Sequence, residues 1–185
     1  MKRLDYIDTA KGILILLVVI GHIVPENSIL RTWIWSFHMP AFFIISGILI
    51  NHSSFTKKSF SELIISSIKS LIIPFVIFEI IGAIADRIMH GSSLNVKGYI
   101  YNSITLRYNN VVDWFLITLF ISRIIVFLVI KIKNKNILLI ICLCFFILGA
   151  FNFNPFICQL LISSSFIIFG YLFNEKYITK NIYYR

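Results

Sequence analysis

The chain has 185 residues, of which 58% are hydrophobic and only 14% are charged, and its mean hydropathy is +0.89. This balance excludes an ordinary soluble domain and predicts an all-α fold, a polytopic transmembrane helical bundle. The net charge of +9 does not indicate a nucleic-acid partner, because the basic residues form short clusters between apolar segments.

Six apolar windows predict six membrane-spanning helices, although the fifth is short for a complete span. Basic clusters alternate with connections poorer in Lys and Arg, and cytoplasmic connections carry the excess of these residues in membrane proteins. The alternation predicts a multi-pass protein of the cell membrane, surrounded by membrane lipid, with both termini in the cytoplasm. The long connection 86–110 is expected at the outer membrane interface. The six windows are 7–24, 34–50, 63–85, 111–130, 137–151 and 155–173.

The first predicted helix carries two ionisable residues, Lys11 and His22, into an apolar span. At about 100° per residue their spacing places both side chains on one stripe, roughly 16 Å apart along the axis. Ionisable groups inside a membrane are costly and are usually functional. The alternatives are a structural histidine bonded to a neighbouring helix and a lysine that snorkels to the surface.

The second predicted helix adds His38, which the expected orientation places at a depth similar to that of His22. Two imidazoles could therefore line one cavity. Pro40 withholds a backbone donor within this helix. For the small residues Ser46 and Gly47, together with Pro40, a kink and close helix packing are the favoured interpretation.

Polar residues also interrupt the third and fourth windows. Lys69, among serines, would suit an anionic ligand arriving from the cytoplasm, although a solvated helix end fits equally well. Glu79 and Arg123 each require a partner or a watery cavity, because an unpaired charge in a membrane is costly. No metal-ligand spacing is present in the sequence, so no metal is expected.

Two long segments resemble the acyltransferase 3 family of integral membrane acyltransferases. The first runs from Arg3 through Lys11 to His22, and the second is Ser36-Phe-His-Met-Pro-Ala-Phe-Phe-Ile-Ile-Ser-Gly47. A basic residue, a ten-residue gap and a histidine match the first-helix signature of that family. The fucose 4-O-acetylase-like branch is the most similar, and residues 71–75 and 113–120 also resemble later family helices.

The resemblance implies transfer of an acyl group, usually acetyl, from cytoplasmic acyl-CoA to a hydroxyl. The acceptor would be a cell-envelope carbohydrate, a lipid-linked glycan or a related molecule. By the same resemblance His22 is the general base and His38 supports the acceptor or the base. Lys11 and Lys69 would stand at the acyl-CoA entrance, where their charge favours the CoA phosphates.

Residues 1–185 are expected to form a single transmembrane acyltransferase 3-like domain. Family members usually have more spans, and a basic pair where Lys69 stands here, so this domain is expected to be incomplete relative to the family. Two other hypotheses are a non-enzymatic carrier or flippase component for a lipid-linked glycan and an inactive fragment of the acyltransferase. The acceptor, the acyl group and the oligomeric state are not specified by these residues.

Overall fold

The computed structural model describes residues 5–52, 54–91, 96–98, 101, 113–151 and 154–173. All regular structure in these residues is helical, which confirms the predicted all-α class. Four helical segments are long and apolar enough to cross a membrane, and two shorter apolar helices accompany them, as expected for a multi-pass membrane protein. The elements are α1 (Asp5–Ile23), α2 (Ile29–His52), η1 (Ser54–Lys57), α3 (Phe60–Ser67), η2 (Ile68–Ile72), α4 (Ile73–His90), α6 (Asp113–Val129), α7 (Lys135–Ala150) and α8 (Pro155–Leu172).

The six apolar windows coincide with six helical segments, but two boundaries differ by several residues. Helix α2 begins at Ile29 rather than residue 34, where the Leu30 N–H donates to the Ser28 hydroxyl at 3.2 Å. Helix α4 continues beyond residue 85 to His90 and ends at Gly91, whose φ of 66° is the left-handed conformation that closes many helices. Hydropathy detects the apolar centre of a helix, whereas capping groups decide its ends.

The predicted connection 86–110 therefore starts later, after His90. Most of it, including nearly all of the expected interfacial segment 99–108, lies outside the described residues.

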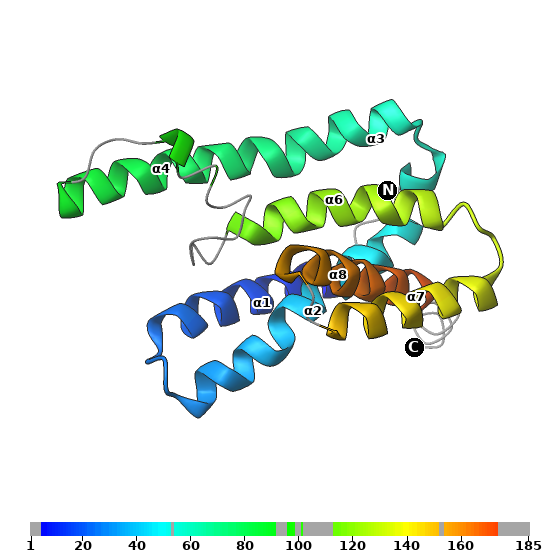
Figure 1. The fold of residues 1–185 in the computed structure, drawn as a ribbon, viewed down its shortest axis with the longest axis horizontal. Helices are drawn as coiled ribbons and strands as arrows, with labels where there is room; N and C mark the ends of the chain where they lie inside the picture. The colour runs from blue at the N-terminus through cyan, green and yellow to red at the C-terminus, as the bar shows by residue number, and fades with distance from the viewer. Residues whose placement is uncertain are drawn as a thin grey trace.

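Elements α3, η2 and α4 form one continuous helix, which is the longest in the described chain (Figure 1). It begins with a capping box, in which the Glu62 N–H donates to the Ser59 hydroxyl and the Glu62 carboxylate accepts from the Ser59 N–H. Pro74 cannot donate a backbone hydrogen bond and crowds the preceding turn. The chain widens there into the π-helical turn η2, where the Ile73 N–H bonds to the Ile68 carbonyl.

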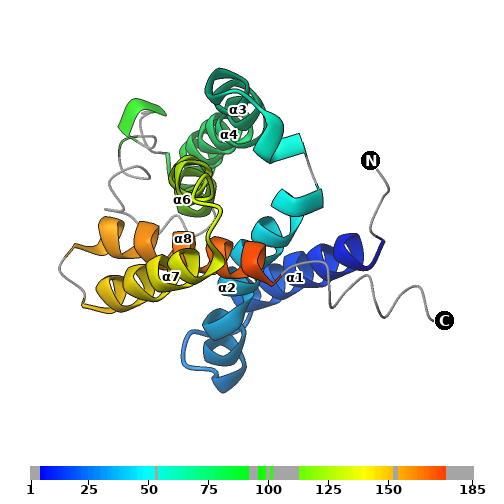
Figure 2. The ribbon, with the colours of Figure 1, turned by 90° about the vertical axis from the view of Figure 1, so that its right-hand side faces the viewer.

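Helices α2 and α8 form the centre of the bundle and cross at close range (Figure 2). A Cβ on Gly47 would overlap the Ile167 carbonyl, and a Cβ on Gly170 would overlap the Ile44 carbonyl. Helix α8 also packs against α6 and α7, and the Ser122 and Ser163 hydroxyls hydrogen-bond at 2.6 Å across the α6–α8 contact. Small residues thus bring helices together where lipid supplies no hydrophobic drive for association.

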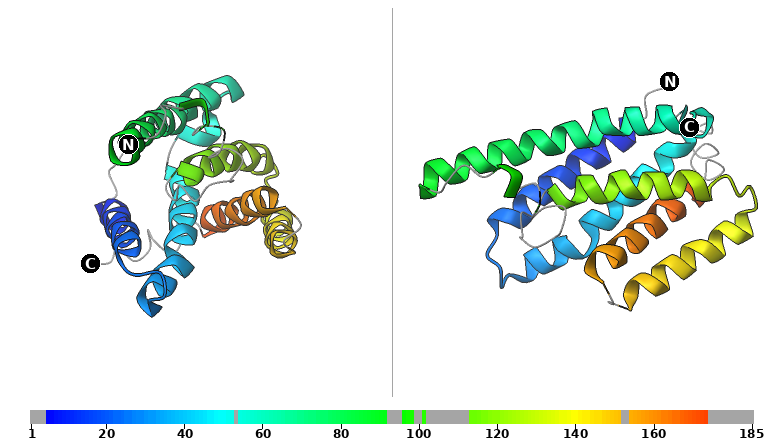
Figure 3. Two further views of the ribbon diagram at one scale, coloured as in Figure 1. Left: turned by 60° about the vertical axis from the view of Figure 1, so that its left-hand side comes forward. Right: turned by 45° about the horizontal axis from the view of Figure 1, so that its top comes forward.

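Helix α1 packs mainly against α2, at the edge of the bundle, and α4 packs against α6 and η2 (Figure 3). The α2–α3 connection and the α6–α7 loop lie at one end of the molecule, while the α1–α2 turn and the end of α4 lie at the other (Figures 1 and 3). The first end carries Lys57, Lys58 and Lys131. This arrangement agrees with the alternation of basic clusters along the chain. That the lysine-bearing end faces the cytoplasm stays a prediction.

Candidate functional site

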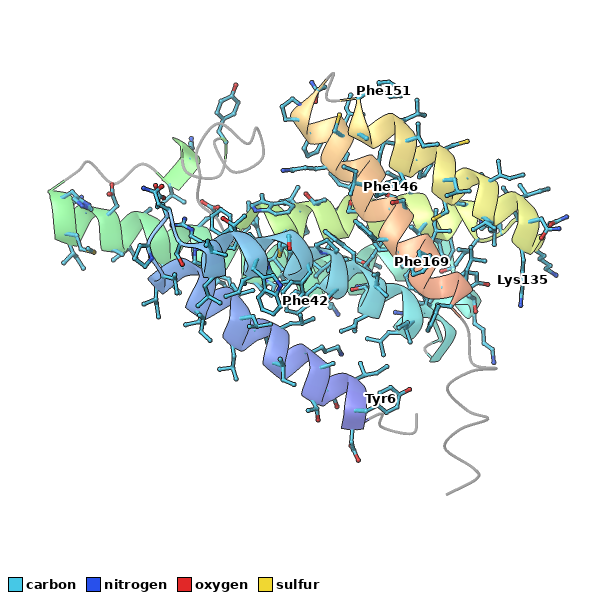
Figure 4. The ribbon with its side chains drawn as sticks, turned by 90° about the horizontal axis from the view of Figure 1, so that it is seen from below. Tyr6, Phe42, Lys135, Phe146, Phe151 and Phe169 are labelled. Carbon is cyan, nitrogen blue, oxygen red and sulfur yellow. The ribbon has the colours of Figure 1, made fainter. Side chains whose placement is uncertain are left out.

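A cavity of about 850 Å³ lies between α1, α2, α4 and α6. Both predicted histidines line it, His22 from α1 and His38 from α2, so the structure brings together two residues that are separate in the sequence. Phe42, labelled in Figure 4, also lines the cavity from α2. The other described walls are largely apolar and include Phe78 of α4 and Trp114 of α6. A mostly apolar pocket with a few convergent polar groups is typical of a small-molecule site.

The His38 ring is fixed by its own helix. It is buried, and its Nδ1 lies 2.7 Å from the Ile34 carbonyl oxygen. Because a carbonyl only accepts hydrogen bonds, we assign the proton of the neutral ring to Nδ1, which leaves the lone pair on Nε2. His38 is therefore a preoriented ring whose Nε2 can accept a proton or a hydrogen bond.

The His22 ring is exposed on the cavity side of α1 and lies beside Trp35, with ring centroids 6.0 Å apart. Gly21 provides the space for this indole, since a Cβ on Gly21 would come within 2.8 Å of Trp35 Nε1. The guanidinium carbon of Arg31 lies 4.3 Å from the Trp35 ring centroid, and Arg31 also pairs with Glu26 at 3.3 Å. The indole is thus held between a helix backbone and a cation.

A second pocket, of about 460 Å³, contains the predicted residue Lys69. Lys57 and Lys58 line the same pocket, as do Glu62 and Ser66. The Lys58 ammonium donates to the Ser66 hydroxyl at 2.8 Å. Three ammonium groups facing one carboxylate give the pocket an excess of positive charge, which suits an anion.

The long helix contributes residues to both the basic pocket and the cavity. Lys69 lies in the π-helical turn η2, and Phe78 of the cavity wall follows nine residues later. At 1.5 Å per residue this is about 14 Å along the axis. A ligand that reached from the lysines to this cavity wall would have to cover at least that axial distance.

Lys11 lies elsewhere. Its ammonium is 3.7 Å from the Asp8 carboxylate, and its side chain is 36% exposed. Lys11 is not among the described residues that line the cavity or the basic pocket. Of the two lysines expected near an anionic ligand, the structure therefore groups only Lys69 with other cations.

The sequence places two charged residues, Glu79 and Arg123, inside apolar spans. Their neighbours in the structure differ. The Arg123 guanidinium carbon lies 5.5 Å from the Phe55 ring centroid, a cation–π contact. Glu79 is only 1% exposed, and neither carboxylate oxygen has a hydrogen-bond partner among the described residues. Burying a carboxyl group without a hydrogen-bond partner is costly.

Sequence reasoning missed the aromatic walls and two of the three cations of the basic pocket. Lys57 and Lys58 served only as a topology signal, although the capping box at Ser59 could have placed them directly above the first turn of α3. No local pattern marks Phe78 or Trp114 as neighbours of His22, since only the packing of α4 and α6 brings them there.

These features define a class of protein: a multi-pass helical membrane protein with a histidine-lined cavity and a separate pocket lined by three lysines. The chain belongs to the acyltransferase 3 family, since residues 4–182 match the family described as an acyltransferase domain. This match confirms the resemblance seen in the first two helices, and family membership implies acyltransferase activity. No curated protein and no solved structure matches the chain significantly.

Proposed function

We propose that the protein transfers an acyl group, acetyl in the usual case, from acyl-CoA to a hydroxyl of a cell-envelope carbohydrate or related acceptor. The observation that carries the proposal is that His22 and His38 line one cavity while three lysines line a second pocket, and that the long helix contributes a residue to each. Acyl transfer from a phosphorylated carrier requires both a base and an anion site.

The chemistry follows from the positions of the groups. The phosphates of acyl-CoA bind Lys57, Lys58 and Lys69, and the thioester extends along the long helix into the cavity. His22 removes the proton of the acceptor hydroxyl while the oxygen attacks the thioester carbonyl. The carbon–sulfur bond then breaks, and the departing CoA sulfur takes up the proton, so atoms and charge balance. His38, fixed through Nδ1, orients the acceptor hydroxyl or the His22 ring through Nε2.

The reaction requires a base positioned beside the acceptor hydroxyl and the thioester carbonyl. An imidazole can both accept and release a proton, which matches the need of a base that must release the proton again in each cycle. Lys11, which pairs with Asp8 on α1, lies outside the pocket proposed for the phosphates.

The test is a transfer assay in membranes that contain or lack the protein, with acetyl-CoA carrying an isotopically labelled acetyl group. We expect the label to appear on envelope glycans, detected by mass spectrometry, together with release of free CoA. A carrier for a lipid-linked glycan would consume no acyl-CoA. Absence of protein-dependent label on any acceptor, with the protein present and folded, would contradict the proposal.

A further inference from the structure

The imidazole of His22 lies near the end of its helix. Helix α1 ends at Ile23, so His22 belongs to the last turn, where the backbone carbonyls lack partners within the helix. The residue is exposed, and among the described residues its ring takes part in no hydrogen bond. A general base must come within hydrogen-bond distance of the proton that it removes. The direction of this imidazole therefore has to be set by ring packing.

Helix α2 supplies the ring that packs against His22. Arg31, Trp35 and His38 follow one another at spacings of four and three residues, which places them on one face of α2. Trp35 and His38 line the cavity together with His22. The ring centroids of Trp35 and His22 lie 6.0 Å apart, and the ring planes meet at 59°. This distance and tilt are typical of favourable aromatic pairs.

The indole of Trp35 is itself restrained from two directions. The Arg31 guanidinium carbon lies over it, 4.3 Å from the ring centroid, and the Arg31 side chain is only 14% exposed. Its Nε1 edge lies against Gly21, the neighbour of His22 in the chain, because a Cβ there would come within 2.8 Å of Nε1. An indole with a cation over its face is better placed to restrain a neighbouring ring than to stack on a substrate.

We infer that Trp35 is a positioning residue for His22. Held between Arg31 and Gly21, the indole restricts the imidazole and keeps it directed into the cavity. This inference rests on the proposed acyl transfer and adds a residue to its site. Positioning of this kind affects the rate strongly, since a displacement of about 1 Å costs up to about 10²-fold in catalysis.

The test measures acyl transfer from labelled acetyl-CoA in membranes that hold equal amounts of each full-length variant. Trp35→Ala should lower kcat by about tenfold, equivalent to about 1.4 kcal/mol. The KM for acetyl-CoA should not change, because Trp35 is not among the described residues of the lysine pocket. Trp35→Phe, which keeps an aromatic ring beside His22, should recover most of the rate. Trp33→Ala is the matched control and should keep the wild-type rate, because Trp33 is 59% exposed on the same helix and is not among the described cavity residues.

A double-mutant comparison separates a positioning role from a purely structural one. If Trp35 acts through His22, Trp35→Ala should not lower the residual rate of His22→Ala any further. The same loss in both backgrounds would overturn the inference, as would a wild-type kcat for Trp35→Ala. Wild-type turnover by His22→Ala alone would instead remove the proposed reaction site, so the two failures are distinguishable.

Gly21→Ala tests the same contact while keeping the indole, and it needs no folded Trp35→Ala. The added methyl group meets Trp35 Nε1, so the indole has to shift. We expect kcat to fall by about three- to tenfold in the wild-type background and not at all in the His22→Ala background. Gly12→Ala on the same helix is the control, since a Cβ there meets nothing within 4 Å. Equal rates for Gly21→Ala and Gly12→Ala would contradict the role of Trp35.

Discussion

The two histidines of the cavity differ in how they are held, and this difference separates their roles. His38 is buried and bonded through Nδ1 to its own helix, so its ring direction is fixed. His22 is exposed on the cavity side, and Trp35 is its ring neighbour among the described ring contacts. A ring open to substrate on one side suits proton exchange, whereas a fixed ring suits orientation.

The lysines give a prediction at the same scale. Lys69→Ala and Lys58→Ala should each raise the KM for acyl-CoA by about tenfold, as expected for loss of a charged hydrogen bond worth about 1.5 kcal/mol. The kcat should change much less, because the phosphates do not react. Lys11→Ala should have a smaller effect, since Lys11 pairs with Asp8 outside the basic pocket.

Steady-state kinetics over a range of acyl-CoA concentrations checks this order of effects. Lys135→Ala is the control, because Lys135 is an exposed lysine at the start of α7 and is not among the described residues of the basic pocket. A larger KM increase for Lys11→Ala than for Lys69→Ala would place the phosphates along α1 instead.

At the scale of elements, the crossing of α2 and α8 determines where the cavity walls stand. Gly47→Ala should destabilise the protein by about 1–3 kcal/mol, because the added methyl group meets the Ile167 carbonyl and the two helices must separate. Gly12→Ala is the control, since a Cβ there meets nothing within 4 Å. Alanine in an exposed helix position is neutral or stabilising. Thermal unfolding in one detergent compares the two variants, and equal transition temperatures would contradict the close crossing.

The elements themselves were largely predictable from the sequence, and the reasons are local. Apolar windows located six helical segments, and Pro74, Ser59 with Glu62, and Gly91 carry the signals for the π-helical turn, the start and the end of the long helix. The π-helical turn was still missed, because Pro74 alone is compatible with a kink, a break or a widened turn.

The candidate site was predictable only for contacts that follow from residue spacing within a single helix. The spacing of Lys11 and His22 places both side chains on one side of the first helix. It does not determine which groups they contact. Lys11 forms an ion pair with the nearby Asp8. The turn η1, by contrast, places Lys57 and Lys58 in the same pocket as Lys69. The Lys11–Asp8 pair is a local i,i+3 contact that the sequence does contain, whereas the grouping of Lys57 and Lys58 with Lys69 depends on the turn before α3 and on the capping of that helix.

At the scale of the whole molecule, the charge distribution predicts that the end carrying Lys57, Lys58 and Lys131 faces the cytoplasm. A cysteine introduced at position 134, in a background without the three native cysteines, should resist a thiol reagent that cannot cross the membrane. A cysteine at position 27, in the α1–α2 turn, should react. Labelling of intact cells measures both, and the opposite pattern would reverse the orientation.

Orientation also sets the direction of the reaction. In the predicted orientation the lysine pocket would take acyl-CoA from the cytoplasm, and the histidines would meet the proposed acceptor nearer the outer face. The long helix α3–η2–α4 spans this distance and carries residues of both sites, Lys69 and Phe78.

The most direct measurement of the central claim is the rate of acyl transfer by His22→Ala, compared with His90→Ala in the same membranes. Loss of a positioned general base should slow transfer by about 10²–10⁴-fold while the protein remains inserted and folded. His90 bonds to Asp86 at the end of α4 and is not among the described residues of the cavity, so His90→Ala should keep the wild-type rate. Wild-type turnover by His22→Ala would contradict the assignment of the cavity as the site of acyl transfer.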